Sequence, residues 1–268
     1  MGSSFNYNVD SAFKAIDKWQ SVIVRNAQGL LESGYNRTAI TFGQNPGSQV
    51  SGSQVGTNGF GGRNSITGGG DSLNITGTHL IFEQGSIEPS FSPTSLAIRG
   101  EGFFVVAENL RPGARLFLTR AGDFHYDGDG NLVSPQGLFV MGANGTLKVD
   151  AQGRLETQPI PVKDPGDGTV NLPEVSLAKV GVRSQLTTTG FGATVYQTND
   201  GSGPMQIFAN GRAEVGFIQA SSIEQPSRVG AAALLQVDTQ KATQTYKIFK
   251  DMLDNFNKTT DDAISVVK

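Results

Sequence analysis

The chain has 268 residues, a formal net charge of −3 and a sequence pI near 5.4, with 35 glycines, two histidines and no cysteine. The lack of cysteine excludes disulfides, thiol nucleophiles and thiolate metal sites, and two histidines leave little for a zinc site or a Ser/His pair. The scattered Lys and Arg form no patch that could neutralise phosphates. We therefore expect one or two domains with no catalytic residues, no cofactor, no metal, no small-molecule substrate and no nucleic-acid partner.

The sequence also carries no signal for the membrane or for cleavage. No apolar run approaches the roughly 18 residues of a membrane span. The first ten residues, MGSSFNYNVD, have neither the basic nor the apolar region of a signal peptide. If the protein leaves the cytoplasm, we expect it to do so without a cleaved signal peptide.

The N-terminal segment from Val9 to Leu31 lacks proline and predicts one helix, with Gly34 as a stop signal. Its apolar residues follow two neighbouring stripes, so the apolar face is wide enough to contact more than one neighbour. One stripe comprises Val9, Phe13, Ile16, Gln20, Ile23, Ala27 and Leu30, and the other Ala12, Ile16, Trp19, Ile23, Asn26 and Leu30.

The C-terminal segment after Pro226 predicts a second, longer helix. Its apolar residues alternate three and four apart over some five heptads, which is typical of a coiled-coil seam. The seam comprises Ala232, Leu235, Thr239, Ala242, Tyr246, Phe249, Leu253, Phe256, Thr260, Ala263 and Val267. The alternative is that both helices pack on a globular core.

The middle of the chain changes character twice. Residues 43–85 are rich in Gly, Ser, Asn, Gln and Thr, which favours an extended arm that orders only against a partner. From about residue 81 to 217, short apolar runs alternate with turn signals, which predicts an all-β core.

The predicted fold class is thus α+β, a mainly-β central domain flanked by terminal α-helices that pair as a coiled-coil-like bundle. The predicted divisions are 1–42, 43–90, 91–217 and 218–268.

Three motifs suggest chemistry but have simpler explanations. Residues 127–131 (DGDGN) match the first positions of a calcium loop, yet Leu132 and Leu138 replace its required Gly and Glu, so we favour a hairpin turn. The glycine clusters at 59–62 and 68–70 precede no strand-to-helix transition, and a flexible linker explains them better than a phosphate cradle. His79 and His125 have no helix-face partner and are expected to be structural.

The sequence resembles the bacterial flagellar rod and hook family of axial proteins nearly end to end. Residues 22–37 (VIVRNAQGLLESGYNR) are similar to the N-terminal signature of that family. The matching positions are Asn26, Gly34, Tyr35 and Arg37. Ala27 and Gly29 depart from the signature, and Glu32-Ser33 stands for a longer Asn-Thr segment.

The central block carries the more specific resemblance. Residues 95–106 (SLAIRGEGFFVV), 118–124 (LTRAGDF) and 127–142 follow the family's strand and hairpin in order and spacing. The matching positions are Gly100, Gly102, Phe103, Phe104, Thr119, Arg120, Gly122 and Phe124. Residues 216–223 (GFIQASSI) and 240–246 (QKATQTY) resemble the entry to the last helix, with Gln219 and Ser222 as departures.

The resemblance implies a structural, non-enzymatic subunit of the flagellar rod, closest to the distal rod type at this length. In such a family both chain ends pair into a bundle that lines a tube, subunits stack helically, and export follows the flagellum's own type III route. The expected partners are further copies of the chain, neighbouring rod and hook proteins and the surrounding ring proteins, in the basal body outside the cytoplasm. The 43–90 arm would stiffen the rod by contacting neighbours.

The same resemblance assigns the apolar helix positions to the assembly interface. These are Val9, Phe13, Ile16, Trp19, Ile23, Leu30, Leu235, Tyr246, Phe249, Leu253, Phe256 and Val267. Alternatives remain in a short hook-type subunit and in a secreted β-domain binding module whose helices only dimerise. A hydrolase that uses Asp/Glu pairs needs neither His nor Cys, but nothing in the order of residues indicates a cleft.

Overall fold

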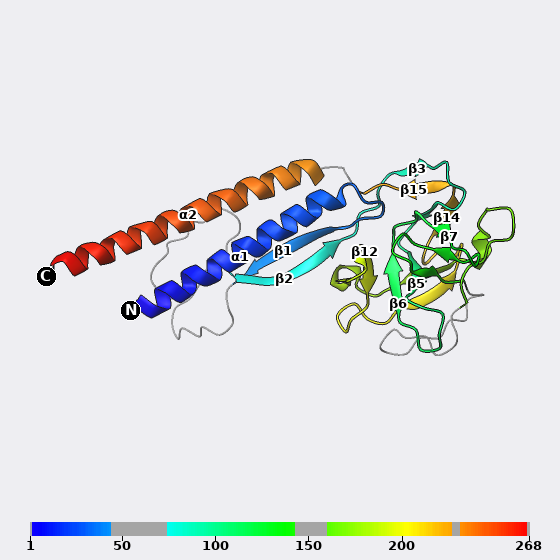
Figure 1. Cartoon of the computed structure of the whole chain (residues 1–268), viewed down its shortest axis with the longest axis horizontal. Helices are drawn as coiled ribbons and strands as arrows, with labels where there is room; N and C mark the ends of the chain where they lie inside the picture. Colours follow the sequence, from blue (N-terminus) through cyan, green and yellow to red (C-terminus); the bar gives the residue numbers. More distant parts are fainter. Residues whose placement is uncertain (1, 44–73, 143–159, 227–230, 267–268) are drawn as a thin grey trace. The chain divides into compact units, whose positions relative to one another are not determined.

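The computed structural model describes residues 2–43, 74–142, 160–226 and 231–266 (Figure 1). The helices are α1 (Gly2–Gly29) and α2 (Ala231–Val266), with short 3₁₀ turns η1 (Leu172–Glu174) and η2 (Arg183–Gln185). The first strands are β1 (Arg37–Gly43), β2 (Asn74–Ile81), β3 (Ile87–Pro89), β4 (Leu96–Arg99), β5 (Phe103–Ala107), β6 (Leu116–Thr119), β7 (His125–Tyr126) and β8 (Leu132–Val133). The others are β9 (Phe139–Val140), β10 (Ser176–Lys179), β11 (Thr187–Thr189), β12 (Gly192–Gln197), β13 (Gln206–Ala209), β14 (Phe217–Ala220) and β15 (Ser222–Glu224).

The chain forms two compact units. Unit 1 comprises Met1–Val24, Ile40–Thr78 and Ala233–Lys268, and unit 2 comprises Arg25–Ala39 and His79–Ala232. The predicted fold class is confirmed, because a mainly-β core is flanked by two terminal helices that are in contact. The predicted domain divisions stay predictions, and residues 44–73 of the predicted arm lie outside the described residues.

Unit 2 is built on an antiparallel sheet whose strands differ in length, and β5 lies near the centre of this sheet. Its strand order is β11-β12-β6-β5-β9-β8-β7, and β10 pairs with β5 and carries β13. Every residue of β5 is buried, because a hydrophobic cluster covers each face of the strand: Phe104 and Val106 lie in one, Phe103 and Val105 in the other. A strand buried on both faces has a continuous apolar sequence, which explains the FFVVA run.

Two small sheets complete unit 2. β4 pairs with β14, and β3 pairs with β15, so the segment 217–224 leaves one small sheet and enters the other. Ser221 lies at this transition with φ +47°, a left-handed conformation that is uncommon outside glycine. Its carbonyl accepts a hydrogen bond from Ser90 N at 2.8 Å, which holds the change of direction in place.

Unit 1 contains most of α1 and α2. Ala12 and Ile16 of α1 are fully buried. The Phe13 ring packs edge-on against Tyr246 of α2 at 5.6 Å between centroids, and also against Phe249 at 6.5 Å. On the other side of α1, Trp19 packs against Phe42 of β1 at 5.0 Å. None of the helices in the described part of the chain is long and apolar enough to cross a membrane.

Gly122 shows why one position of the central block requires glycine. It follows β6 in a turn that lies directly against the backbone of β4, where its own carbonyl accepts a hydrogen bond from Leu96 N at 2.8 Å. A Cβ at this position would overlap the carbonyl of Leu96 and lie 3.4 Å from the Phe104 ring. The turn can approach the strand this closely only without a side chain.

We predict that Gly122→Ala lowers the free energy of unfolding by about 2 kcal/mol or more, because the backbone must move to admit a methyl group. Gly128 is a matched control, since a Cβ there would meet nothing within 4 Å and its φ is not left-handed. Gly128→Ala should change stability by less than about 1 kcal/mol. Urea unfolding of the two variants measures the difference, and equal effects would contradict the close-packing argument.

Candidate functional site

The motif residues of unit 2 surround one buried ion pair, Arg120 with Glu224. Arg120 follows β6, and Glu224 is the last residue of β15. The Arg120 Nη2 lies 2.9 Å from Glu224 Oε2, Nε donates to Oε2 at 3.0 Å, and the two side chains are 7% and 4% exposed. Nη2 also donates to Oε1 at 3.0 Å, so the guanidinium binds both carboxylate oxygens in a bidentate arrangement.

The rest of the Arg120 guanidinium holds the turn between β4 and β5. Its Nη1 donates to the carbonyls of Gly100 and Gly102, each at 2.7 Å. Gly100 has φ +135°, and a Cβ on Gly102 would lie 2.6 Å from the Val215 carbonyl, so the turn admits no side chain at either position. This geometry accounts for the Gly-Glu-Gly sequence before the FFVV strand.

Glu224 joins two further segments of the chain to the same point. Its Oε1 accepts hydrogen bonds from Gln84 Nε2 at 3.2 Å and from Gly85 N at 3.0 Å. Its main-chain carbonyl accepts one from Gly34 N at 3.0 Å. The segments around residues 34 and 85 are therefore both hydrogen-bonded to Glu224, and we call the Arg120–Glu224 ion pair with these attached segments the joint.

Near the end of α1, Asn26 is hydrogen-bonded to Tyr35 and Thr38 in the segment that leads from the helix past the joint. The Asn26 Oδ1 accepts hydrogen bonds from Tyr35 Oη and Thr38 N, each at 2.9 Å, and its Nδ2 donates to Thr38 O at 2.8 Å. Burial raises the pKa of Tyr35 to about 12, so its hydroxyl keeps the proton that it donates. Gly34, with φ +64°, lies so close to the Arg120–Ala121 backbone that a Cβ would overlap it.

The remaining motif residues pack around the joint. Thr119 Oγ1 accepts a hydrogen bond from Ala121 N at 3.0 Å. The rings of Phe104 and Phe124 lie edge-on at 5.0 Å, and Phe103 packs against Tyr196. Arg37 begins β1 and is half-buried. Twelve positions that are far apart in the sequence thus come together in unit 2: Asn26, Gly34, Tyr35, Arg37, Gly100, Gly102, Phe103, Phe104, Thr119, Arg120, Gly122 and Phe124.

Sequence reasoning missed Glu224, Gln84 and Asn36, although each lines or completes the joint. Asn36 Nδ2 donates to Tyr196 Oη at 3.2 Å, across 160 residues of sequence. A buried arginine requires an anionic partner, so Arg120 within an apolar motif was a signal that a carboxylate existed. No local pattern distinguished Glu224 from the other acidic residues as that partner.

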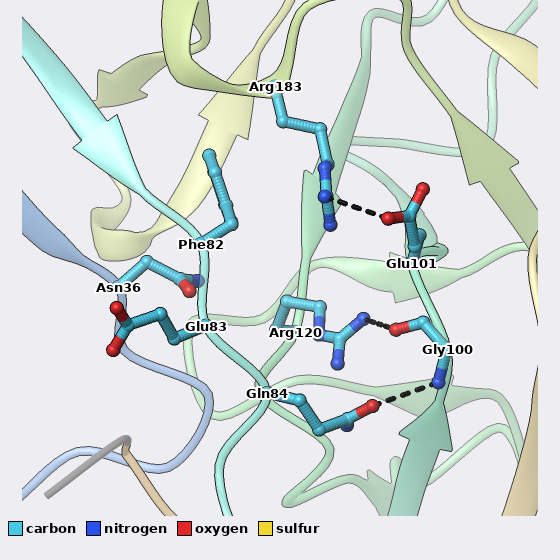
Figure 2. A pocket seen from close by; sticks show the side chains of 8 residues that line it. All are labelled: Asn36, Phe82, Glu83, Gln84, Gly100, Glu101, Arg120 and Arg183. Atoms are coloured by element: carbon cyan, nitrogen blue, oxygen red, sulfur yellow. Dashed lines mark hydrogen bonds and ion pairs between the residues drawn. The ribbon is translucent and has the colours of Figure 1, made fainter. Parts of the chain in front are cut away.

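A cavity of about 230 Å³ opens beside the joint (Figure 2). Phe82, Glu83 and Gln84 line one side, and Glu101 and Arg183 line the other. Arg183 Nη2 donates to Glu101 Oε1 at 3.0 Å on that side. The cavity lies entirely within unit 2.

Most of the predicted assembly residues whose side chains are described are buried or partly buried within the chain itself. Ile16 and Ile23 are buried, and Phe13, Trp19, Leu30, Leu235, Phe249 and Leu253 are partly buried. Tyr246 packs on Phe13 yet stays 41% exposed. The side chains of Val9 and Phe256, and the whole of Val267, lie outside the described residues. The wide face of α1 meets α2 and β1 of its own chain, and a role of these residues between subunits stays a prediction.

A different face of α2 carries exposed apolar residues that sequence reasoning did not single out. Leu234, Val237 and Ile248 are 44%, 42% and 58% exposed. At 100° per residue they lie within about 60° of one another, beside the seam that meets Phe13, and Leu234 lies about 60° around the helix from Phe249. We call these three residues the outer face of α2. Their spacing was visible in the sequence, but the stronger seam beside them obscured it.

The DGDGN segment is a hairpin turn, as predicted. It joins β7 to β8, with Gly130 at φ +75°. The Asp127 carboxylate accepts hydrogen bonds from Asp129 N, Asn131 N and Asn131 Nδ2, and the Asn131 side-chain hydrogen bond is the main cause that lowers the pKa of Asp127. Among the described residues no group of three His, Cys, Asp or Glu is arranged to hold a metal ion.

Comparison with known families identifies the central part of unit 2. A family model described as "Flagellar hook protein FlgE/F/G D1 domain" matches residues 97–185. This segment contains Arg120 and the β5–β6 hairpin, so this part of unit 2 is similar to the D1 domain of the flagellar hook and rod axial proteins. The family is one of structural proteins, and the prediction of a non-enzymatic protein is confirmed.

The similar curated proteins are named flagellar hook protein FlgE. The Helicobacter pylori protein is 34% identical over 142 residues, 48% of this chain and 18% of that protein. The Brucella abortus protein is 38% identical over 107 residues, 37% of this chain and 26% of that protein. The Borreliella burgdorferi protein is 28% identical over 149 residues, 53% of this chain and 33% of that protein. The chain thus spans a third or less of each relative's length.

One solved structure is also similar in part, a crystal structure of Helicobacter pylori flagellar hook protein FlgE2. It is 28% identical, with a TM-score of 0.21, and the match covers 29% of this chain and 21% of that one. This likeness is too small to extend the comparison to the whole fold.

We predict that removing one partner of the joint destabilises unit 2 strongly. Glu224→Leu or Arg120→Met should each lower the free energy of unfolding by about 3 to 5 kcal/mol, because the other charge stays buried without its counterion. The double variant Arg120→Met/Glu224→Leu should recover a large part of that loss. A double-mutant cycle by chemical denaturation measures the coupling. Arg183→Met, which breaks a partly exposed pair with Glu101, is the control and should cost less than about 1 kcal/mol.

Proposed function

We propose that this chain, part of which is similar to the D1 domain of the flagellar hook and rod family, is an axial structural subunit that self-assembles helically into a tube. The tube would transmit torque and conduct exported subunits. The family match supports the axial assignment. The proposed location is the flagellar basal body outside the cytoplasm, reached by the flagellum's type III route without a cleaved signal peptide.

The observation that carries self-assembly is the outer face of α2. The seam of this helix is already in contact with α1 through Tyr246 and Phe249, so it needs no second chain. Leu234, Val237 and Ile248 remain exposed on a different side. Full burial of one such side chain contributes roughly 1.5 to 3 kcal/mol, so a neighbouring copy that covered all three would gain a useful part of its binding energy there.

The construction of unit 2 suits a part that carries load. Its central strand β5 is buried on both faces, and the joint ties three separate segments to the sheet. Closely packed interiors have low compressibility and transmit strain. A subunit with such a core can pass torque along a tube without chemistry.

The finer proposal is a rod subunit, of the distal type. It rests on the Gly- and Ser-rich sequence of residues 44–73, which is inserted between the paired strands β1 and β2. We propose that this insertion contacts neighbouring subunits and stiffens the rod. The partners would be further copies of the chain, the adjoining rod and hook proteins and the surrounding ring proteins.

The alternative place is the hook, because the relatives reported above are named hook proteins. Electron microscopy of basal bodies from a strain that lacks this chain separates the two. Basal bodies with an incomplete rod support the rod assignment, whereas complete rods without a hook contradict it and support the hook.

We predict that charge on the outer face of α2 abolishes assembly. Leu234→Asp/Val237→Asp/Ile248→Asp should keep the wild-type unfolding midpoint but form no tubes in negative-stain electron microscopy, where concentrated wild-type protein does. The control Gln236→Asp/Gln240→Asp/Thr243→Asp adds the same charge at exposed positions on a third side of the helix and should assemble normally. Tubes of the first variant at wild-type yield would contradict the interface.

A further inference from the structure

Phe91 is the most exposed large apolar side chain that the structure describes, with its whole ring in solvent. It lies in the turn after β3, between Ser90 and Ser92. Single surface apolar residues are common, but a ring that is wholly in solvent is the one that gains most from being covered by another molecule.

The turn that carries Phe91 is fixed by hydroxyl groups. Ser90 Oγ donates to Ser95 Oγ at 3.0 Å and accepts from Ser92 N at 3.2 Å. Thr94 Oγ1 donates to the Phe124 carbonyl at 2.6 Å, which attaches the turn to the sheet. The ring is therefore presented on a preorganised support, and little conformational entropy is lost when a partner covers it.

The cavity beside the joint has the chemistry to accept an aromatic ring. Phe82, one of its lining residues, packs edge-on against Phe103 at 5.3 Å and against Tyr196 at 5.5 Å, so another ring would extend this aromatic cluster. The guanidinium groups of Arg120 and Arg183 both face the cavity (Figure 2). Aromatic rings bind favourably beside other rings and over guanidinium groups.

Phe91 cannot fill the cavity of its own chain. Gln84 and Gly85 are tied to Glu224, and β3 then leads away from the cavity, paired with β15. Phe91 lies six residue steps along the chain from Gly85, a span of at most about 20 Å in extended backbone. The ring and the cavity thus lie at separate places on unit 2.

We propose that Phe91 of one copy inserts into the cavity beside Phe82 of a second copy. The contact is heterologous, since one subunit gives the ring and the next gives the cavity, so a linked pair keeps one free ring and one free cavity for further copies. Repetition of such a contact builds a helical polymer or a closed ring. This inference rests on the proposed function, which supplies the second copy, and adds a contact in unit 2 to the one on α2.

Cysteine cross-linking tests the contact directly, because the natural chain has no cysteine. Ser92→Cys places a thiol beside the ring and leaves Phe91 intact, and Glu83→Cys places one at the cavity. Oxidation of the double variant should give a ladder of disulfide-linked oligomers on non-reducing gels. An equal mixture of the two single variants should give linked heterodimers and nothing longer.

The controls address the ring itself. Phe91→Ala in the double-cysteine chain should lower the yield of linked oligomers about tenfold or more, as truncation of a central interface residue does. Phe217→Ala, at another exposed phenylalanine, should leave the yield unchanged.

Homodimers of a single-cysteine variant in place of heterodimers would overturn the proposal. Tubes without any ladder would overturn it and leave the proposed function standing, whereas a ladder without tubes would support the contact and count against the tube.

Discussion

The structure of unit 2 depends on the buried ion pair between Arg120 and Glu224. A charge that is removed from water needs an opposite charge and hydrogen bonds for its remaining polar atoms, and the joint supplies both. The guanidinium uses the carbonyls of Gly100 and Gly102, and the carboxylate uses Gln84 and the amide of Gly85. These groups come from two segments, residues 84–85 and 100–102, so neither segment can move away without leaving part of the buried ion pair without its hydrogen bonds.

This constraint explains why the motif residues form one set. Gly34 must lack a side chain so that the chain after α1 can lie on the Arg120–Ala121 backbone, and Asn26 holds that chain through Tyr35 and Thr38. The joint thus makes residues 25–39 part of the β unit instead of a free linker.

The sequence was informative where structure depends on local patterns. The 3.5-residue spacing predicted α2, short apolar runs such as FFVVA predicted the strands of a β core, and the DGDGN segment predicted a hairpin, since each needs only neighbours in the chain. Glu224 could not be predicted, because it meets Arg120 across 104 residues and that pairing is set by the whole sheet. The same holds for the wide face of α1, whose second neighbour is Phe42 of its own chain, and for the apolar residues that remain exposed on α2.

The most direct measurement of the joint is native-state hydrogen exchange at the amides of Gly34, Gly85 and Gly100, which donate to Glu224 or Gln84. If the ion pair binds the three segments into the cooperative core, these amides exchange with the same free energy as those of β5, and Glu224→Gln lowers that free energy for all three together. Fast exchange of these amides, as in ordinary surface turns, while β5 stays protected would contradict the account.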